Sequence, residues 1–314
     1  MNAQRRSASW RAPITVLVVL GVLATACGDD DDTGAGDSPD GSEAVLSIGA
    51  IPDQEPERLQ RTYGLLADHL AAELGVTVEY VPVIDYPGAI SGFRVGDLDV
   101  VWFGGLTGVQ ARLEVEGANA IAQRDIDESF TSAFIAGADT GIDPISDVAG
   151  LSVLEGHSFT FGSDSSTSGR LMPQSFMTEA GLDIATSFDG AAGFSGSHDA
   201  TIEVVSAGTF EVGALNSQVW DDRVAEGVVD PDRVIEIFRT PPYYDYHWVA
   251  QPDLDDRFGD GFTDRFVEAL TSLDAADPGQ AEILELFGAG SFIATSNDNY
   301  AAIEAVGRAA GLIR

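Results

Sequence analysis

The sequence predicts an α/β fold built as two lobes, each a mostly parallel sheet flanked by helices, with a ligand cleft between the lobes. Short apolar strands alternate with segments of helical period, which is typical of parallel sheets. This pattern runs through the first hundred residues and restarts near residue 150. The 314 residues exceed one ordinary domain, and a hydrophobic content of 44% can supply two cores.

The first half is expected to contain three strand–helix units. Leu59, Tyr63, Leu66 and Leu70 recur at three- and four-residue steps, which indicates an amphipathic helix, and Gly75 is a natural end for it. The expected strands are 45–51, 76–83 and 98–103, and the expected helices are 59–74, 85–94 and 106–115.

The second half repeats the plan and then adds helices at the end of the chain. Its expected strands are 151–154, 158–161, 210–215 and 234–238, and its expected helices are 169–180, 197–205, 262–272, 278–286 and 298–309. We therefore expect a first lobe over 44–135, a second lobe over 136–240, and a return to the first lobe over 241–314.

The N-terminus predicts export and a lipid anchor. A basic start precedes an apolar run over 14–24, which is too short to span a membrane well and is typical of a signal peptide over 1–26. Cys27, the single cysteine, follows at once in a segment that resembles a bacterial lipobox, although Ala24 stands where Leu is more usual. Residues 27–43 are rich in Asp, Gly and Ser and are expected to form a disordered tether.

Composition excludes several classes of function. A net charge of −35 argues against binding nucleic acid or anionic lipid, both of which reward basic patches. A single cysteine allows no intrachain disulfide. The four histidines are dispersed, so no metal site is expected, and no Gly-x-Ser-x-Gly motif for a nucleophile is present. We expect no catalytic residue and no cofactor.

A run of hydroxyl residues follows the expected strand 158–161. Ser166, Thr167 and Ser168 precede a segment of helical period. A helix start presents unpaired N–H groups and the positive end of its dipole, so it favours anions, and hydroxyl groups add neutral donors. The alternative is that these residues are simply good helix caps.

The two halves align in more than their fold class. Tyr86 lies ten residues before Gly96, and His198 lies ten residues before Gly208. Further along, Gly104 corresponds to Asn216. Since open α/β sheets bind ligands at the carboxyl ends of their strands, these positions are expected to face one cleft. The expected ligand-binding residues are Tyr86, Trp102, Phe103, Gly104, Ser166, Thr167, Ser168, His198, Asn216 and Tyr243.

Alternatives stay open for several of these residues. Tyr86 and Tyr243 are also candidates for packing, Trp102 and Phe103 for the core, and His198 for a helix-capping surface position. Arg124 and Arg170 could bring charge to the site, although nothing in their spacing requires it.

Several motifs together resemble the phosphonate/phosphite type of ABC-transporter substrate-binding protein, including its selenate-binding subgroup. They are Gly49-Ala-Ile-Pro-Asp53, Asp85-Tyr86, Gly96-Asp-Leu-Asp-Val-Val-Trp-Phe-Gly-Gly105, Ser166-Thr-Ser-Gly169, Gly196-Ser-His198, Gly213-Ala-Leu-Asn216, Thr240-Pro-Pro-Tyr-Tyr-Asp-Tyr-His-Trp248 and Phe287-Gly-Ala-Gly-Ser-Phe292. The resemblance implies a type II periplasmic-binding-protein fold, a lobed clamp that closes on an oxyanion through a hinge. It also implies that the Ser-Thr-Ser run, Tyr86 and His198 bind the oxyanion.

One position departs from the family's pattern. Phosphonate binders usually carry an acidic residue at the place of Asn216, where it meets an amine or a protonated oxygen. Neutral Asn216 puts an aminophosphonate ligand in doubt and fits a ligand without a cationic group.

We therefore expect an exported, membrane-anchored, monomeric binding component of an ABC importer, working with permease and ATPase subunits. Its ligand is expected to be a small oxyanion: selenate, selenite, phosphite, phosphonate or phosphate. The alternative is a tethered sensor that uses the same clamp, and a phosphoester hydrolase is a weaker possibility.

Overall fold

The computed structural model describes residues 44–314. The expected signal peptide over 1–26, the tether over 27–43 and the lipidation site Cys27 lie outside the described residues. Within residues 44–314, none of the helices combines the length and the apolar character needed to cross a membrane.

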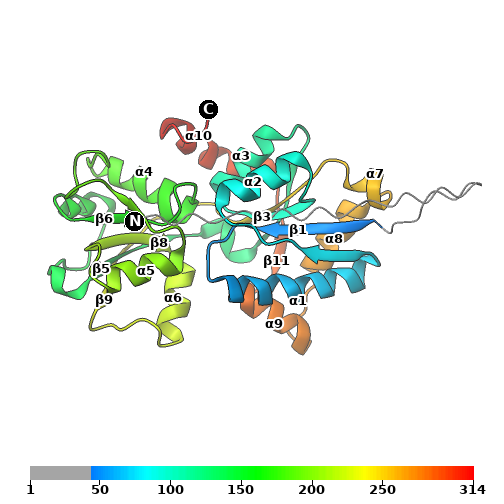
Figure 1. Cartoon of the computed structure of the whole chain (residues 1–314), viewed down its shortest axis with the longest axis horizontal. Helices are drawn as coiled ribbons and strands as arrows, with labels where there is room; N and C mark the ends of the chain where they lie inside the picture. Colours follow the sequence, from blue (N-terminus) through cyan, green and yellow to red (C-terminus); the bar gives the residue numbers. More distant parts are fainter. Residues whose placement is uncertain (1–43) are drawn as a thin grey trace, which may run out of the picture. The chain divides into compact units, whose positions relative to one another are not determined.

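Six strands form the first sheet, in the order β11-β4-β10-β3-β1-β2 (Figure 1). Their bounds are β1 Val45–Ala50, β2 Thr77–Tyr80, β3 Val100–Phe103, β4 Asn119–Arg124, β10 His247–Ala250 and β11 Phe292–Ala294. Strand β1 runs parallel to β2 and β3, whereas β10 is antiparallel to β3 and β4, and β11 is antiparallel to β4. We call this sheet with its helices the first lobe.

Five strands form the second sheet, in the order β7-β6-β8-β5-β9. Their bounds are β5 Ser132–Gly137, β6 Phe159–Phe161, β7 Gly193–Phe194, β8 Val212–Asn216 and β9 Val234–Arg239. Strand β6 is parallel to β7 and β8, and β5 is antiparallel to β8 and β9. This sheet with its helices is the second lobe.

Both sheets are mixed, rather than mostly parallel as expected, because β5, β10 and β11 run antiparallel to their neighbours. Strands β4, β5, β10 and β11 were not predicted from the sequence. These strands are the ones next to the points where the chain changes sheet, together with the C-terminal edge strand. The expected boundary at 135/136 falls inside β5, so the second sheet already begins at Ser132. The boundary at 240/241 lies in the segment between β9 and β10.

The two segments that cross between the sheets pair with each other. Phe130 N donates to Tyr243 O and Tyr243 N donates to Phe130 O, both at 2.9 Å. Residues 125–131 and 240–246 therefore form a short antiparallel connection between the lobes, and Tyr243 belongs to it.

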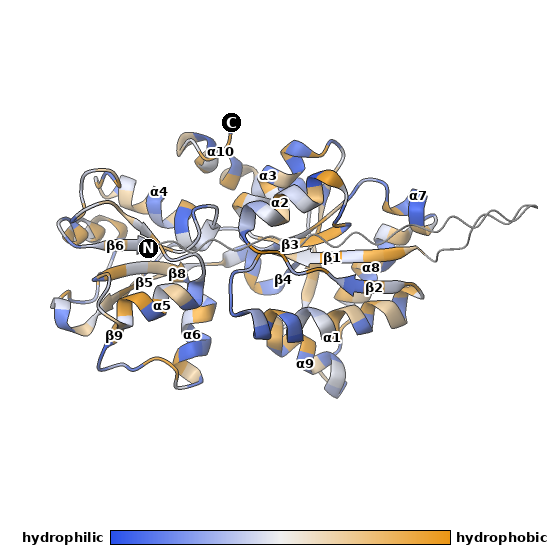
Figure 2. Cartoon of the chain, in the orientation of Figure 1, coloured by the Kyte–Doolittle hydropathy of each residue, from blue (hydrophilic) through white to orange (hydrophobic). Residues whose placement is uncertain are grey.

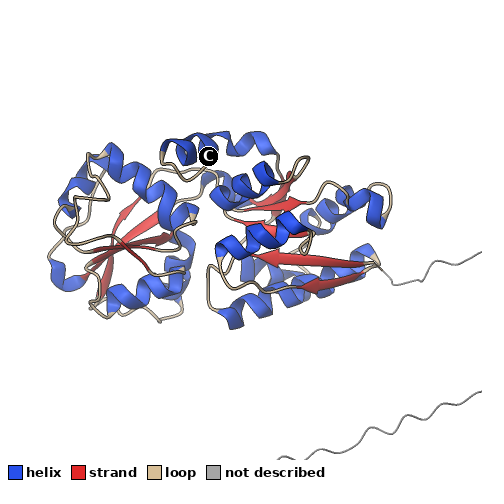
Figure 3. Ribbon diagram, turned by 45° about the horizontal axis from the view of Figure 1, so that its top comes forward, coloured by secondary structure: helices blue, strands red, loops and turns tan. Residues whose placement is uncertain are grey.

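Helices cover both sheets. The first lobe contains α1 Pro56–Leu74, α2 Tyr86–Val95, α3 Gly105–Glu114, α7 Leu254–Phe258, α8 Phe262–Thr271, α9 Pro278–Phe287 and α10 Ala301–Ala309. The second contains α4 Met172–Glu179, α5 His198–Ser206 and α6 Ser217–Ala225. Helices α1 and α9 lie on one side of the first sheet and α2 and α3 on the other, and Figure 3 shows the strands enclosed by helices. Apolar residues gather on the strands and on the sheet-facing sides of the helices (Figure 2).

One expected element is wrong. Residues 151–154, read as a strand, lie within a 3-10 helical segment over Val148–Leu154. Leu151 and Leu154 are both buried, and their three-residue spacing puts them on one side of such a turn. The Asp147 side chain accepts from Gly150 N and starts the turn as an N-cap.

Two mid-helix glycines allow a test of the packing between α3 and β10. A Cβ on Gly108 would overlap the ring of His247, which stacks on Tyr300 with centroids 3.7 Å apart and has no room to move. We expect Gly108→Ala to lower the free energy of unfolding by about 1–3 kcal/mol in urea denaturation. Gly64→Ala in α1 is the matched control, since nothing lies within 4 Å of its Cβ. It should stabilise by about 0.5–1 kcal/mol, and equal effects of the two changes would contradict this packing.

Candidate functional site

The hydroxyl run lies at the start of a helix, where it meets the first lobe. After β6 the chain forms a π-helical turn over Thr167–Leu171 that continues into α4. Ser166 caps the turn by accepting from Gly169 N at 2.9 Å. Thr167 Oγ1 accepts from Leu106 N, in the first turn of α3, at 2.8 Å. The run thus joins the N-terminal ends of two helices that belong to different lobes.

Three buried polar atoms in this region have no hydrogen-bond partner among residues 44–314. They are Tyr86 Oη, Ser168 Oγ and Asp245 Oδ2. Burial raises the pKa of Tyr86, and the Ser166 side chain opposes that rise. Buried polar groups without a partner are costly, so these three atoms are candidates to pair with a polar ligand.

Asp245 closes the other side of the run. Its Oδ1 accepts from Gly105 N at 2.9 Å. Burial raises the pKa of Asp245 to about 7, against the lowering by the Gly105 N–H and the Thr167 hydroxyl. A Cβ on Gly104 would lie 3.0 Å from Thr167 Oγ1 and 3.4 Å from Asp245 Oδ1, so the glycine permits this close approach.

His198 is the first residue of α5 and is fully buried. Its Nδ1 accepts from Asn216 N at 3.2 Å, so Nε2 carries the hydrogen and faces Tyr246 Oη at 3.2 Å. Burial lowers the pKa of His198 to about 4, which keeps the ring neutral near pH 7. A Cβ on Gly169 would lie 3.2 Å from His198 Cε1, so the ring sits directly against the hydroxyl run.

The Tyr246 hydroxyl connects both lobes. It donates to Asp53 Oδ2 at 2.8 Å and accepts from Asn216 Nδ2 at 3.1 Å. The other side-chain atom of Asn216, Oδ1, caps α6 by accepting from Gln218 N and Val219 N. Burial raises the pKa of Asp53 to about 6, against the hydrogen bond from Tyr246. Asn216 therefore holds Tyr246 in place instead of presenting a free amide.

Trp102 and Phe103 lie on opposite faces of β3. Trp102 stacks on Tyr246 with centroids 5.7 Å apart. It lines a cavity of about 20 Å³ behind Tyr246 that Asp53, Arg124 and Asn216 also line. Phe103 is fully buried and packs edge-on against Phe93 at 5.9 Å. Neighbouring side chains in a strand point to opposite faces, so the Phe103 side chain points away from Trp102 and packs in the core of the first lobe. Its place in the ligand site stays a prediction.

Tyr243 supports the hydroxyl run from behind. Its hydroxyl lies 2.6 Å from Ser132 Oγ, which donates to the backbone oxygen of Ser168 at 2.7 Å. Tyr243 therefore contacts the run through Ser132 within the connection between the lobes.

Both candidate arginines are engaged elsewhere. Arg124 is buried and bonds Asp127 through two nitrogens, each at 2.7 Å, and it also donates to Phe287 O. Arg170 stacks over the Phe161 ring at 4.4 Å, and burial lowers its pKa to about 10. The groups around the hydroxyl run are thus mainly neutral donors and buried carboxyls.

The predicted set of ligand-binding residues did not include Asp53, Asp245 or Tyr246, although all three lie in motifs that carry the family resemblance. Asp53 follows β1, and Asp245 and Tyr246 directly precede β10. Because β10 is antiparallel to β3, its first residues lie at the edge where β1 and β3 end. A polar cluster just before an antiparallel strand was the available signal. Across residues 44–314, no cluster of three or more His, Cys, Asp or Glu could hold a metal ion.

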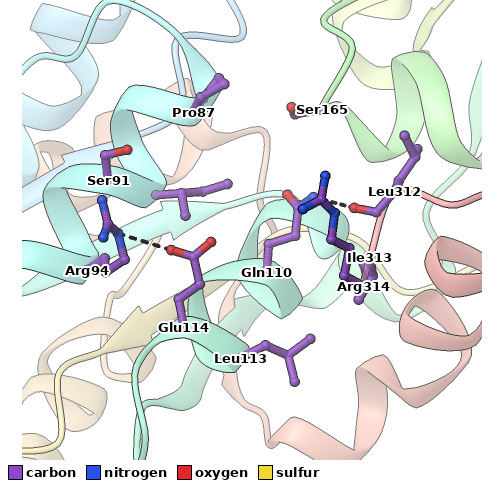
Figure 4. A pocket seen from close by; sticks show the side chains of 11 residues that line it. Pro87, Ser91, Arg94, Gln110, Leu113, Glu114, Ser165, Leu312, Ile313 and Arg314 are labelled. Carbon is purple, nitrogen blue, oxygen red and sulfur yellow. Dashed lines mark hydrogen bonds and ion pairs between the residues drawn. The ribbon is translucent and has the colours of Figure 1, made fainter.

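A larger hollow of about 670 Å³ lies beside α2, α3 and the C-terminus (Figure 4). Of the hydroxyl segment only Ser165 reaches it, and the Arg94–Glu114 ion pair occupies its wall. It is wide and open, and none of the candidate residues lines it. We therefore place the candidate site at the buried hydroxyl run.

The fold and the site geometry together are those of a two-lobed binding protein for a small ligand. A family model described as "ABC transporter, phosphonate, periplasmic substrate-binding protein" matches residues 48–300, and the chain belongs to this family. It is a transport component and not an enzyme, it is exported, and it acts with the permease and ATPase of an ABC importer.

Individual relatives agree with this assignment. The chain is 46% identical over 270 residues to the probable ABC transporter phosphite binding protein PhnD1 of Prochlorococcus marinus, covering 86% of this chain and 91% of that protein. The structure of that PhnD1 with methylphosphonate matches with a TM-score of 0.84, covering 86% and 99%. A phosphonate-transporter binding protein of Pseudomonas aeruginosa, at 19% identity and covering 84% and 85%, shares the fold with a TM-score of 0.73.

The raised pKa of Asp245 predicts how its removal changes stability with pH. The folded chain holds the Asp245 proton up to about pH 7, whereas the unfolded chain releases it near the ordinary value of 3.8. This carboxyl therefore makes the protein less stable as pH rises from about 4 to 7. We expect the stability of Asp245→Asn relative to wild type to increase over that range in urea titrations. A difference that stays constant with pH would contradict the buried, protonated carboxyl.

Proposed function

We propose that this chain captures phosphite or a small phosphonate without an amine, such as methylphosphonate, at the hydroxyl run. The observation that carries the proposal is the pair of buried, unpartnered hydroxyls of Tyr86 and Ser168, which come from opposite lobes. Each is a donor for one oxygen of an oxyanion. Thr167 and the His198 ring lie beside them.

The chemistry of the surroundings favours a weakly charged oxyanion. A helix start and hydroxyl groups stabilise negative charge without a neighbouring cation. Asp245 Oδ2 also has no hydrogen-bond partner in the part of the chain that the structure describes, and a carboxyl there pairs best with an oxyanion that still carries a proton. Three charge-assisted hydrogen bonds, from Tyr86, Ser168 and Asp245, at roughly 1.5–3 kcal/mol each, bring binding toward the about −8 kcal/mol of a micromolar site.

Two features argue for a ligand without an amine. Asn216 carries no charge, and both polar atoms of its side chain are already used by α6 and Tyr246. The relative PhnD1 is named as a phosphite binding protein and was solved with methylphosphonate. Selenate, selenite and phosphate stay as outcomes of the test below.

We also propose that the mature protein is a monomer anchored through a lipid on Cys27, with residues 27–43 as the tether. A signal-peptide pattern followed at once by the lipobox-like segment supports the anchor. The first lobe is then formed by 44–131 and 241–314, and the second by 132–240, which matches the sheet membership of the strands.

Removing the unpartnered hydroxyls should separate binding from stability. We expect Ser168→Ala and Tyr86→Phe each to weaken phosphite or methylphosphonate binding at least tenfold by calorimetry, since each loses a bond to a charged group. The ligand-free protein should be as stable as wild type or slightly more so, because neither hydroxyl has a hydrogen-bond partner to lose within residues 44–314.

The control is Ser165→Ala, whose hydroxyl bonds the neighbouring Asp164 at 3.2 Å and should leave affinity unchanged. Unchanged affinity in Ser168→Ala and Tyr86→Phe would refute the site. A thermal-shift panel of phosphite, methylphosphonate, phosphate, selenate, selenite and sulfate tests the ligand, since binding stabilises only the folded chain. The largest shift with an anion other than the first two would refute the proposed specificity.

A further inference from the structure

An ion-pair cluster joins the lobes away from the hydroxyl run. Arg58, in the first turn of α1, reaches across to the second lobe. Its Nη1 donates to Glu226 Oε1 at 2.9 Å, and its Nη2 lies 3.4 Å from Asp222 Oδ2. The Arg58 side chain is only 20% exposed, so its charge is partly shielded from solvent. Arg58 is not among the residues that line the cavity behind Tyr246.

Hydrogen bonds within the second lobe orient its side of this contact. Arg223 donates to Glu226 Oε2 at 2.7 Å through Nη1 and to Asp199 Oδ1 at 2.6 Å through Nε. The other oxygen of Asp199, Oδ2, accepts from Glu55 N at 3.0 Å, directly before α1. Every carboxylate at this contact is therefore oriented by an arginine of its own lobe or of the opposite one. We call Arg58, Asp199, Asp222, Arg223 and Glu226 the α1–α6 latch.

The latch is continuous with the candidate site along the chain. Asp53 O accepts from His198 N at 3.0 Å, and Glu55 N meets the next residue of α5, Asp199. One short loop thus carries Asp53, which bonds Tyr246 in the site, and leads straight into the turn of α1 that carries Arg58. This loop therefore links the latch directly to the candidate site.

We infer that Arg58 is an affinity-determining residue that never touches the ligand: its ion pairs with α6 stabilise the closed arrangement of the lobes. The inference rests on the proposed function, because closure is where the ligand would be held. A contact present only in the closed arrangement adds its free energy to that of ligand binding. Since the pairs are ionic and partly exposed, salt should weaken that contribution.

The chain offers a matched control for Arg58. Arg61 lies one turn further along α1 and pairs with Glu282 of α9, inside the first lobe. Both changes remove one arginine from the same helix and one charge from a very acidic protein. Only Arg58→Ala removes a contact between the lobes.

Titration with phosphite and with methylphosphonate at low and high salt tests the inference. At 20 mM NaCl, Arg58→Ala should weaken binding about three- to tenfold, and Arg61→Ala by less than about twofold. Near 1 M NaCl, where the Debye length falls to about 3 Å, wild type should approach Arg58→Ala. Competition from chloride and screening of the ligand affect wild type, Arg58→Ala and Arg61→Ala alike. The salt dependence of the Arg58→Ala affinity therefore measures these two effects in the absence of the latch.

A charge swap separates the latch from simple damage to the fold. Arg58→Glu should bind more weakly than Arg58→Ala, because it faces two carboxylates. Adding Asp222→Arg should recover part of the affinity, since the ion pair of Asp222 is with Arg58 and the Arg223–Glu226 pair is left intact. Equal weakening by Arg58→Ala and Arg61→Ala, or parallel salt curves for wild type and Arg58→Ala, would overturn the inference. Failure of the swap to recover any affinity while both single variants stay folded would do the same.

A measurement without ligand keeps this test apart from that of the proposed function. Spin labels at Val95→Cys and Val153→Cys, both exposed and on different lobes, in a Cys27→Ser background report the distance between the lobes. Arg58→Ala should lower the closed fraction, and salt should lower it in wild type. If wild type binds neither anion, the proposed ligand is wrong. The label distances still test the latch in that case, because equal distances in wild type and Arg58→Ala would overturn the inference about Arg58.

Discussion

The arrangement of the two lobes depends on the hydrogen bonds of the buried Tyr246 hydroxyl. One oxygen atom donates to Asp53 of the first lobe and meets Asn216 and His198 of the second. Since Tyr246 itself lies on the segment that crosses between the sheets, its hydroxyl orients that connection, both lobes and the His198 ring together. The tautomer of His198 follows from the same network, because Asn216 N occupies Nδ1 and leaves the Nε2 hydrogen for Tyr246.

The buried arginines of this acidic chain lie in structural ion pairs and not at the hydroxyl run. All the lysine and arginine positions of this chain are arginines. Two buried ones have structural roles. Arg124 pairs with Asp127 and lies under the Tyr246 ring, and Arg223 pairs with Asp199 in the latch. Buried ion pairs of this kind position groups more than they stabilise the fold. The hydroxyl run is left with neutral donors, so its selectivity depends on the geometry and protonation of the ligand.

Much of the fold follows from local pattern, and the remainder depends on pairing between distant segments. The period of α1 and its end at Gly75, where φ is 69°, were predictable because both are local properties. The antiparallel strands β5 and β10 are short apolar runs whose partners lie far along the chain, and nothing local marks them. The site divides in the same way. The hydroxyl run was visible as a helix start, whereas Asp245 became part of the site only through the antiparallel register of β10.

A strongly negative protein can bind an anion because its charge acts at long range and its site acts at short range. At physiological ionic strength the Debye length is about 8 Å, so most surface carboxylates are screened from a buried ligand. The nearest carboxyls, Asp53 and Asp245, have raised pKa values of about 6 and about 7, since burial opposes their ionisation. They therefore repel an anion less than ordinary aspartates would. The same desolvation that makes these carboxyls weak acids makes the Tyr86 and Ser168 hydroxyls strong donors. In the proposed function these groups, which come from both lobes, surround the anion away from water, so its binding depends on the contacts between the lobes.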